Sequence, residues 1–167
     1  MLDGDRSERR AERPANASFP ARGRLLGLDY GTKRIGLALS NLEQTIATPH
    51  ETYERRDETQ DARHLARTVK EFAVVGLVVG LPVHMSGDEG EKAREARTFG
   101  EWVARVTSLP VMFTDERYTT AQADEHLFAA QVSPKKRKAL RDMLAAQILL
   151  QAFLDSPRDQ VPPGPLD

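Results

Sequence analysis

The segment Val74–Leu81 (VVGLVVGL) is apolar at every position. A strand with one face in water alternates apolar and polar side chains, whereas a strand that is covered on both faces reads as an uninterrupted apolar run. This run therefore predicts a buried strand within a sheet that has other elements packed on both of its faces. A sheet layered between helices is the core of an α/β protein.

Two more apolar runs, Arg24–Asp29 and Arg34–Ser40, enclose the Gly-containing turn YGTK and predict a β-hairpin. Thr45–Tyr53 is expected to be a third strand. Pro49 places that strand at the sheet edge, because proline cannot donate a hydrogen bond to a ladder. Val111–Thr114 is expected to be the last strand. Together with the buried run, these segments predict a five-stranded sheet.

Helical spacing of apolar residues predicts the elements that cover the sheet. One helix is expected around Leu65 and a second around Phe99, and Thr119 and Gln122 form a capping-box pattern at the start of another. A long helical segment runs from about Pro134 to Leu154. The expected order is β-β-β-α-β-α-β-α, which describes an α/β fold with a mixed sheet and helices on both faces.

A chain of 167 residues is expected to form one domain. We expect that domain at residues 24–155, between a disordered N-terminal arm (1–23) and a disordered Pro-rich tail (156–167). The absence of cysteine excludes disulfides, zinc knuckles, Fe–S clusters and thiol nucleophiles. No stretch reaches the roughly 18 apolar residues of a membrane span, and the N-terminus lacks the apolar core of a secretory signal. The sequence therefore predicts a cytoplasmic protein.

Three acidic residues occupy positions next to apolar segments, where a charged side chain is costly to bury. Asp29 ends the first apolar strand, Glu116 follows the last strand, and Asp142 lies among apolar neighbours in the final helix. Because neighbouring strands end close together, Asp29 and Glu116 could converge, and a helix packed across that end could add Asp142. Oxygen ligands without His or Cys suit Mg²⁺ or Mn²⁺. Two such ions about 3.5–4 Å apart would clamp the attacking and leaving oxygens of a phosphodiester.

Taken singly, each acid has a plainer interpretation, in which Asp29 caps a turn, Glu116 pairs with an arginine and Asp142 faces solvent. The charges just before Asp142 favour the functional interpretation. The chain has 24 Lys and Arg against 25 Asp and Glu, so attraction to nucleic acid must come from local charge. The residues expected to contact phosphates are Lys33, Arg34, Arg117, Lys135, Lys136, Arg137, Lys138 and Arg141. Aromatic residues make up only 6% of the chain, so base stacking is not indicated.

Four blocks of the sequence together resemble the YqgF/RuvX family of RNase H-like nucleases, whose members also carry the older name of Holliday-junction resolvase homologues. The blocks are GLDYGTKRIGLALS, VVGLPVHMSGDEG, FTDERYTTAQAD and DMLAAQILLQAFL, and they span about Arg24 to Asp155. The resemblance implies an RNase H-like fold, Mg²⁺-dependent endonuclease activity and trimming of the 5′ end of precursor 16S rRNA in ribosome biogenesis. It carries the catalytic and metal-binding acids of the family onto Asp29, Glu116 and Asp142.

Three other functions stay open on the sequence alone. The same chemistry could act on branched, four-way DNA, because phosphate contacts carry no sequence information. Two symmetrical cuts would then need a homodimer rather than a monomer. The chain could also be a non-catalytic nucleic-acid-binding module, although a pure binder gains nothing from carboxylates that face phosphate. The hairpin LDYGTKRIGLAL also resembles the first phosphate loop of sugar kinases and actin, but 167 residues are too few for two lobes around a nucleotide.

Overall fold

The computed structural model describes residues 19–82, 90–116 and 119–157. Its elements, in chain order, are β1 (Arg24–Asp29), β2 (Arg34–Ser40), β3 (Ala47–Glu54), α1 (Glu58–Glu71), β4 (Val74–Leu81), α2 (Glu91–Thr107), β5 (Val111–Asp115), α3 (Thr119–Ala129) and α4 (Pro134–Asp155). Every predicted strand is present. The helices expected from Thr119 and from about Pro134 are both present, as α3 and α4, so the chain ends in two helices where the expected order wrote one α.

The sheet has the order β3-β2-β1-β4-β5. β1 pairs antiparallel with β2, and β2 pairs antiparallel with β3, whereas β4 runs parallel to both β1 and β5. The predicted mixed five-stranded sheet is therefore confirmed. β3 lies at an edge, as Pro49 predicts, and the register between β2 and β3 shifts next to the pair formed by Ala38 and Pro49.

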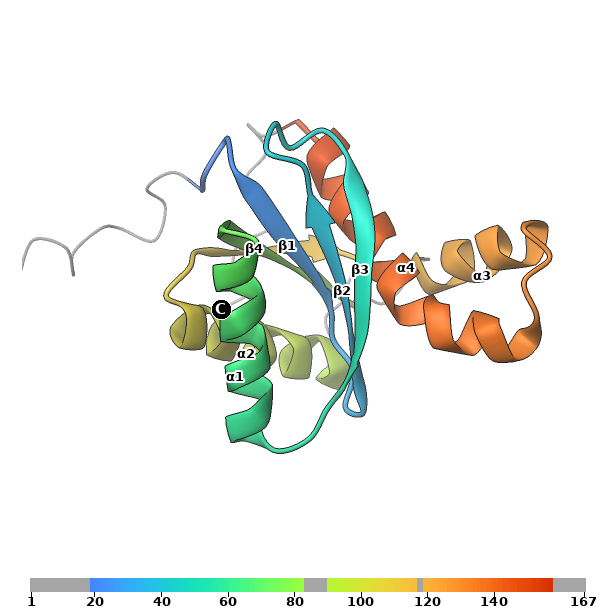
Figure 1. Cartoon of the computed structure of the whole chain (residues 1–167), viewed down its shortest axis with the longest axis horizontal. Coiled ribbons are helices and arrows are strands. Elements are labelled where there is room, and N and C mark those ends of the chain that lie inside the picture. Colours follow the sequence, from blue (N-terminus) through green and yellow to red (C-terminus); the bar gives the residue numbers. More distant parts are fainter. Residues whose placement is uncertain (1–18, 83–89, 117–118, 158–167) are drawn as a thin grey trace, which may run out of the picture.

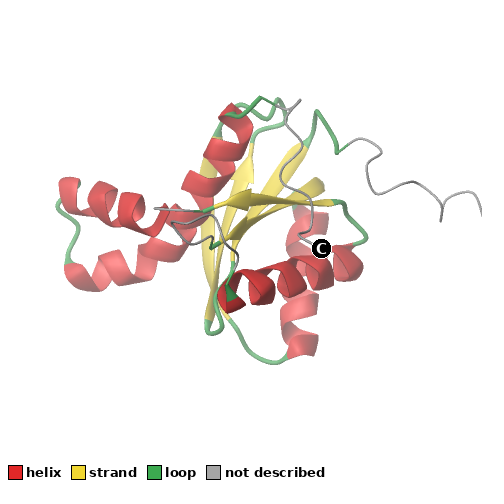
Figure 2. Ribbon diagram, turned by 180° about the vertical axis from the view of Figure 1, so that it is seen from behind, coloured by secondary structure: helices red, strands yellow, loops and turns green. Residues whose placement is uncertain are grey.

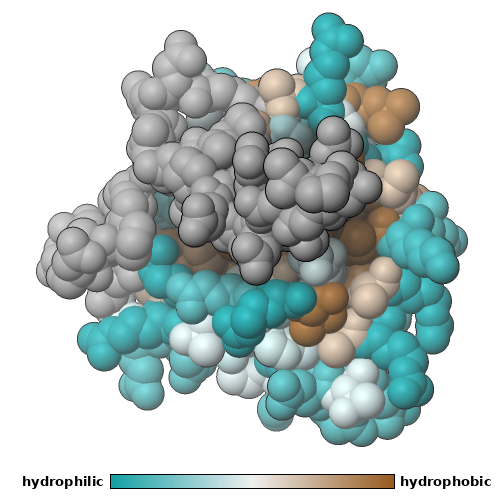
Figure 3. Space-filling model, turned by 90° about the vertical axis from the view of Figure 1, so that its left-hand side faces the viewer, coloured by the Kyte–Doolittle hydropathy of each residue, from teal (hydrophilic) through white to brown (hydrophobic). Residues whose placement is uncertain are grey.

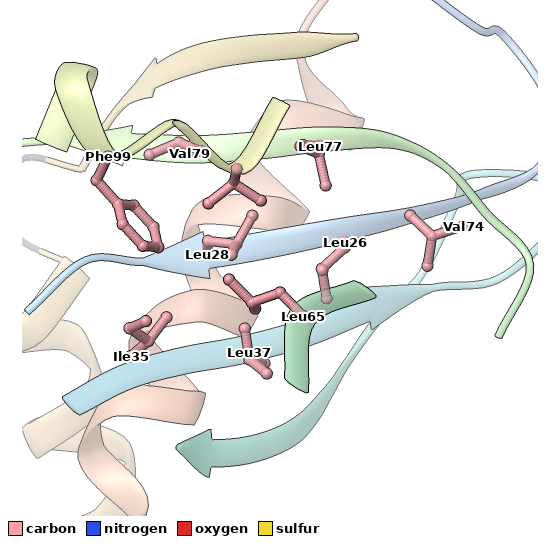
Figure 4. Close-up of a cluster of buried hydrophobic side chains, with 10 residues drawn as sticks. Leu26, Leu28, Ile35, Leu37, Leu65, Val74, Leu77, Val79 and Phe99 are labelled. Carbon is pink, nitrogen blue, oxygen red and sulfur yellow. The ribbon is translucent and has the colours of Figure 1, made fainter. Parts of the chain in front are cut away.

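Helices cover both faces of the sheet, as the layers in Figure 1 and the reverse view in Figure 2 show. On one face, Leu26 and Leu28 of β1 pack with Leu65 of α1 and Phe99 of α2 in a buried cluster (Figure 4). On the other face, a second cluster joins Leu25 of β1 to α4. Successive residues of a strand point to opposite faces, so β1 supplies both clusters.

α4 lies unusually close to the sheet because the residues beneath it are small. A Cβ at Gly27 would come within 2.9 Å of the Leu150 Cβ, and a Cβ at Gly36 would overlap the backbone carbonyl of Asp142. Ala38, between them on the same face, is fully buried. These small residues fix the depth at which α4 crosses β1 and β2, and therefore fix where Asp142 lies.

Two glutamines set the position of α4 along the sheet. The Gln151 Oε1 accepts a hydrogen bond from the Ala47 backbone N–H (2.9 Å), and the Gln147 Nε2 donates to the Ala47 carbonyl (3.1 Å). Gln151 also donates to the Thr45 carbonyl (3.0 Å). The polar end of β3 is thus joined to the helix through side chains.

α3 and the first half of α4 form a helical hairpin that projects from one end of the sheet (Figures 1 and 2). The Ser133 side chain caps α4 by accepting the Lys136 backbone N–H, and Pro134 follows in the first turn. Nearer the sheet, Arg141 of α4 pairs with Asp124 of α3 (Nε–Oδ1 3.0 Å). This α3–α4 hairpin carries most of the predicted basic residues.

The folded part of the chain begins before the predicted domain start at residue 24. The Phe19 ring packs edge-on against Phe153 of α4, and the Gln44 side chain donates to the carbonyls of Pro20 and Gly23. The rest of the predicted arm and most of the predicted tail lie outside the described residues.

Within the described ranges, no helix has the length and apolar character needed to cross a membrane. Figure 3 faces the end of the molecule opposite the α3–α4 hairpin, and the surface that grey atoms leave visible there is mostly hydrophilic, with smaller apolar patches.

Candidate active site

Two of the three candidate acids meet at one edge of the sheet. β1, β4 and β5 are parallel, so their carboxyl ends lie together. Asp29 is the last residue of β1, and Glu116 directly follows β5. The Glu116 backbone N–H donates to the Leu81 carbonyl (3.0 Å), which extends the ladder by one residue. Alternation along β1 turns Leu25, and hence Asp29, toward the face that α4 covers.

Glu116 occupies space that Gly80 leaves open on the same face. A Cβ at position 80 would overlap the Glu116 Oε2 and come within 2.8 Å of the Leu149 side chain. The Glu116 carboxyl therefore lies over β4 and next to α4. Any larger residue at position 80 would displace this carboxyl from Asp29.

Asp29 and Glu116 share a hydrogen bond between their carboxyl groups. Burial raises the pKa of Asp29 well above its usual value, and the Glu116 charge, the shared hydrogen bond and the Asp142 charge raise it further. Burial also raises the pKa of Glu116, and the Asp115 charge adds to this rise, whereas the hydrogen bond from Asp29 opposes it. Both carboxyls therefore bind a proton more readily than they would in water, and Asp29 is the one whose pKa the second carboxyl raises further.

Asp142 lies beside this pair, but its side chain makes its direct contact with the Arg34 guanidinium. Its backbone carbonyl lies against Gly36, which is the residue paired with Asp29 across β1 and β2. Its Oδ2 accepts a hydrogen bond from the Arg34 Nε at 2.8 Å, in an ion pair whose side chains are 38% (Arg34) and 21% (Asp142) exposed. Residues far apart in the sequence are thus brought together, and Arg34 holds the third acid.

The predicted basic residues fall into three groups. Lys33, Lys135, Lys136 and Lys138 are exposed, whereas Arg34, Arg137 and Arg141 each contact a side chain of the protein. Arg117 lies outside the described residues. Arg34 therefore has a partner that sequence reasoning did not predict, namely a candidate metal ligand. The lysines remain the residues with side chains most open to a phosphate backbone.

The three acids do not form a ready metal site in this conformation. Among residues 19–82, 90–116 and 119–157, no group of three or more His, Cys, Asp or Glu side chains is arranged to hold an ion. We attribute this to Asp142, which faces Arg34. The chemistry of the site still fits a hard divalent cation, because all three candidate residues offer carboxylate oxygens, and burial and the Glu116 charge raise the pKa of Asp29.

Sequence reasoning missed two kinds of residue at this end of the molecule. Gly36 and Gly80 make room for α4 and for Glu116, and their signal in the sequence is a glycine inside a strand, which often marks a close approach of another chain segment. Phe128 of α3 is 73% exposed. In the sequence, Phe128 follows Leu127 and lies outside the apolar helix face formed by Ala123 and Leu127. This position could have indicated an exposed aromatic ring.

Solved structures with a similar fold are RNase H-like resolvases. RuvC of T. thermophilus in complex with a Holliday junction substrate aligns with a TM-score of 0.50, covers 78% of this chain and 93% of that chain, and is 17% identical. The fowlpox virus Holliday junction resolvase aligns with a TM-score of 0.51, covers 79% of this chain and 97% of that chain, and is 12% identical. The RNase H-like fold is thereby confirmed.

Sequence comparison then defines the family. A family model described as "RuvX: Holliday junction resolvase" matches residues 23–156. A relative named "Putative pre-16S rRNA nuclease", from Paramagnetospirillum magneticum, is 44% identical over 140 residues, which cover 84% of this chain and 90% of the relative. One so named from Rhodopirellula baltica is 38% identical over 144 residues, or 86% of this chain and 83% of the relative. The chain belongs to the RuvX family, which confirms the resemblance.

Proposed function

We propose that this protein is a metal-dependent endonuclease that hydrolyses phosphodiester bonds, and that its physiological substrate is the precursor of 16S rRNA. The observation that carries the proposal is the carboxyl pair of Asp29 and Glu116, with Asp142 beside it, at the carboxyl edge of the parallel strands. The names of relatives that cover most of the chain support the choice of substrate. Processing of ribosomal RNA would place the protein in the cytoplasm.

Burial raises the pKa of both Asp29 and Glu116, and the Glu116 charge raises that of Asp29 further, so the pair opposes folding. Such a pair is better explained by chemistry than by stability. Asp29, Glu116 and Asp142 would hold Mg²⁺ or Mn²⁺, with Asp142 exchanging Arg34 for the ion. When bound, the ion polarises the phosphate and lowers the pKa of a bound water. The charge of the site would then change from repelling phosphate to attracting it.

The basic residues would hold the nucleic acid across this site. Lys135, Lys136 and Lys138 lie on α4 within two turns of Asp142, so a phosphate backbone bound along the helix would pass the acids. Arg137, Arg141, Lys33, Arg34 and Arg117 are proposed to extend the same surface. These contacts position the substrate without reading its sequence.

The test compares Mg²⁺-dependent cleavage of a precursor 16S rRNA fragment by the wild type and by Asp29→Asn, Glu116→Gln and Asp142→Asn. Each variant should lose at least about a hundredfold in rate, since changes one shell further from a metal already cost that much. Asp57→Asn is the matched control, because Asp57 is an exposed helix cap and asparagine caps equally well. Full activity in a folded Asp29→Asn protein would refute the proposal.

Four-way DNA is the second candidate substrate, because the matching family model is described as a junction resolvase. Cleavage of precursor rRNA and of junction DNA should be measured side by side, with the oligomeric state determined in each complex. Symmetrical cuts in junction DNA by a homodimer, without cleavage of the RNA, would replace rRNA as the substrate. Binding without cleavage of either nucleic acid would leave a non-catalytic module.

A further inference from the structure

Phe128 is the most exposed large hydrophobic side chain among the described residues, at 73% of its surface, compared with 60% for Ile46 and 55% for Leu42. It lies near the end of α3, on the α3–α4 hairpin that projects from the sheet (Figure 1). An aromatic ring in this position contributes nothing to either core cluster. The ring is therefore open to contact with a ligand, and its surroundings decide which kind of ligand it fits.

The surroundings of the ring suit a flat ligand with negative charge nearby. The Arg137 guanidinium lies over the ring, 5.6 Å from its centroid. Two open hollows, with volumes of about 790 and 610 Å³, are both lined by Phe128, Ala129 and Arg137. Asp124 and Glu125 also line the larger one, so the smaller one is the less acidic of the two. Neither hollow is lined by any of the three candidate acids. The hairpin thus offers a binding surface separate from the carboxyl site.

The charge of the hairpin selects among possible occupants. Between residues 119 and 141, five basic residues outnumber the acids Asp124 and Glu125. Lys135, Lys136 and Lys138 are exposed on the first turns of α4. Cores of protein–protein interfaces are depleted in lysine, whereas an aromatic ring among Lys and Arg is typical of surfaces that bind single-stranded nucleic acid.

We propose that Phe128 stacks against an unpaired base of the nucleic acid, and that the α3–α4 hairpin thereby selects RNA with single-stranded nucleotides next to the cut. The proposal rests on the proposed function only for the identity of the ligand. Arg137 lies five residues before Asp142 on the same helix, which corresponds to about 7.5 Å along the axis. That distance is about two steps of a nucleic-acid strand at 3.4 Å per step. Along the helix axis, the stacked base therefore lies within a few nucleotides of the level of Asp142.

The first experiment measures binding of a fluorescent single-stranded RNA in EDTA, so that cleavage is not involved. Phe128→Ala should weaken binding between about fivefold and about a hundredfold, as loss of one stacked base does. Its dependence on salt should equal that of the wild type, because no phosphate contact is lost. Lys136→Gln should instead lower the slope of log affinity against log salt by about 0.7. Ile46→Ala, which removes another exposed apolar side chain elsewhere, should leave binding unchanged.

The second experiment detects stacking directly. Phe128→Trp places a fluorophore in the hairpin, and its emission should be quenched when single-stranded RNA binds, but not when a blunt RNA duplex binds. Ile46→Trp is the control and should not respond to either ligand. Quenching by single-stranded RNA alone supports the proposal, and equal emission with and without RNA overturns it.

The failures of the two proposals are distinguishable. Unchanged affinity in Phe128→Ala, with normal cleavage by the wild type, would remove the stacking role and leave the nuclease intact. Weakened binding in Phe128→Ala, with no metal-dependent cleavage by the wild type, would keep the stacking role and remove the nuclease. A shift in oligomeric state in Phe128→Ala, without a change in RNA affinity, would overturn the proposal in favour of contact with a second copy of the chain.

Discussion

Two aspartates, Asp61 and Asp29, show how differently this protein treats partly or fully buried acids. Asp61 of α1 is 1% exposed. Burial alone would raise its pKa, but the Arg56 backbone N–H (2.9 Å), the Tyr53 hydroxyl (2.9 Å) and the Arg55 Nε (3.2 Å) all donate to it and hold its pKa below the usual value. Burial, together with the hydrogen bond to Asp61, raises the pKa of Tyr53 to about 12. Asp61 is a charge that the fold has fully satisfied.

Asp29 has the opposite surroundings. Its neighbours are Glu116 and Asp142, so burial and like charge act together and its pKa rises. No described hydrogen bond from an arginine or a backbone N–H compensates it. Burial therefore does not by itself reveal the role of an acidic residue. The donors around Asp61 indicate a stabilising role, whereas the acids around Asp29 are consistent with the proposed catalytic role.

The largest effect on stability is expected when Asp61 and its hydrogen bonds are removed. Asp61→Ala removes the partner of a partly buried arginine and leaves three donors without their acceptor, which should lower the free energy of unfolding by about 3 kcal/mol. Urea unfolding followed by circular dichroism measures this loss. A loss below about 1 kcal/mol would mean that the Asp61 network contributes no more than an exposed ion pair.

The next largest effect on stability is expected when Mg²⁺ binds at the site of Asp29, Glu116 and Asp142. Mg²⁺ at a hundred times its dissociation constant should raise the free energy of unfolding of the wild type by about 2.7 kcal/mol. Asp29→Asn should lose this response, while Asp57→Asn and a destabilised Asp61→Ala should keep it. Thermal unfolding with and without Mg²⁺ measures the response. An equal rise in Asp29→Asn would show that the ion binds elsewhere.

Without metal, Asp29→Asn should raise rather than lower stability, by about 1 kcal/mol, because it removes a charge that repels Glu116. The gain depends on pH. The folded-state pKa of Asp29 is raised, so the wild type has no penalty below the usual value of 3.8 and acquires one as the pH rises toward the folded pKa. The Asp61 contribution, with a lowered pKa, is instead present above 3.8 and lost as the pH falls through its folded pKa. Measuring the free energy of unfolding from pH 3 to pH 8 separates the Asp29 contribution from the Asp61 contribution. A stability gain in Asp29→Asn that stays constant over this range would contradict the raised pKa of Asp29.

The smallest effect is expected at the ion pair of Arg34 with Asp142. Arg34 is 38% exposed, so Arg34→Gln should cost less than about 1 kcal/mol in the absence of metal. Lys33→Gln, a change of the neighbouring exposed cation, serves as the control and should cost nothing measurable. A loss above about 2 kcal/mol in Arg34→Gln would show that this arginine is a structural partner like Arg55, and not one that a bound ion can replace.

The strand pattern is sufficient to predict the sheet and two of the acids. Uninterrupted or alternating apolar runs indicate the five strands, and a polar residue at the end of such a run points to Asp29 and Glu116. The parallel direction of β1, β4 and β5 then follows from the helices between them. These features are local, so one sequence is enough to reveal them.

The contacts of α4 could not be predicted in the same way. The ion pair of Arg34 with Asp142 joins residues that are 108 positions apart, and it depends on how deeply α4 settles onto Gly27 and Gly36. The exposure of Phe128 depends on the direction in which the α3–α4 hairpin leaves the sheet. Both are results of tertiary packing, which periodicity does not encode.

The most direct test of the central claim is a crystal structure of the wild type with Mn²⁺, whose anomalous scattering locates the ion without reference to activity. Manganese should be bonded to carboxylate oxygens of Asp29, Glu116 and Asp142, with Arg34 turned away from Asp142. Manganese bound at other residues, or Asp29 and Glu116 still hydrogen-bonded to each other at saturating Mn²⁺, would contradict this assignment.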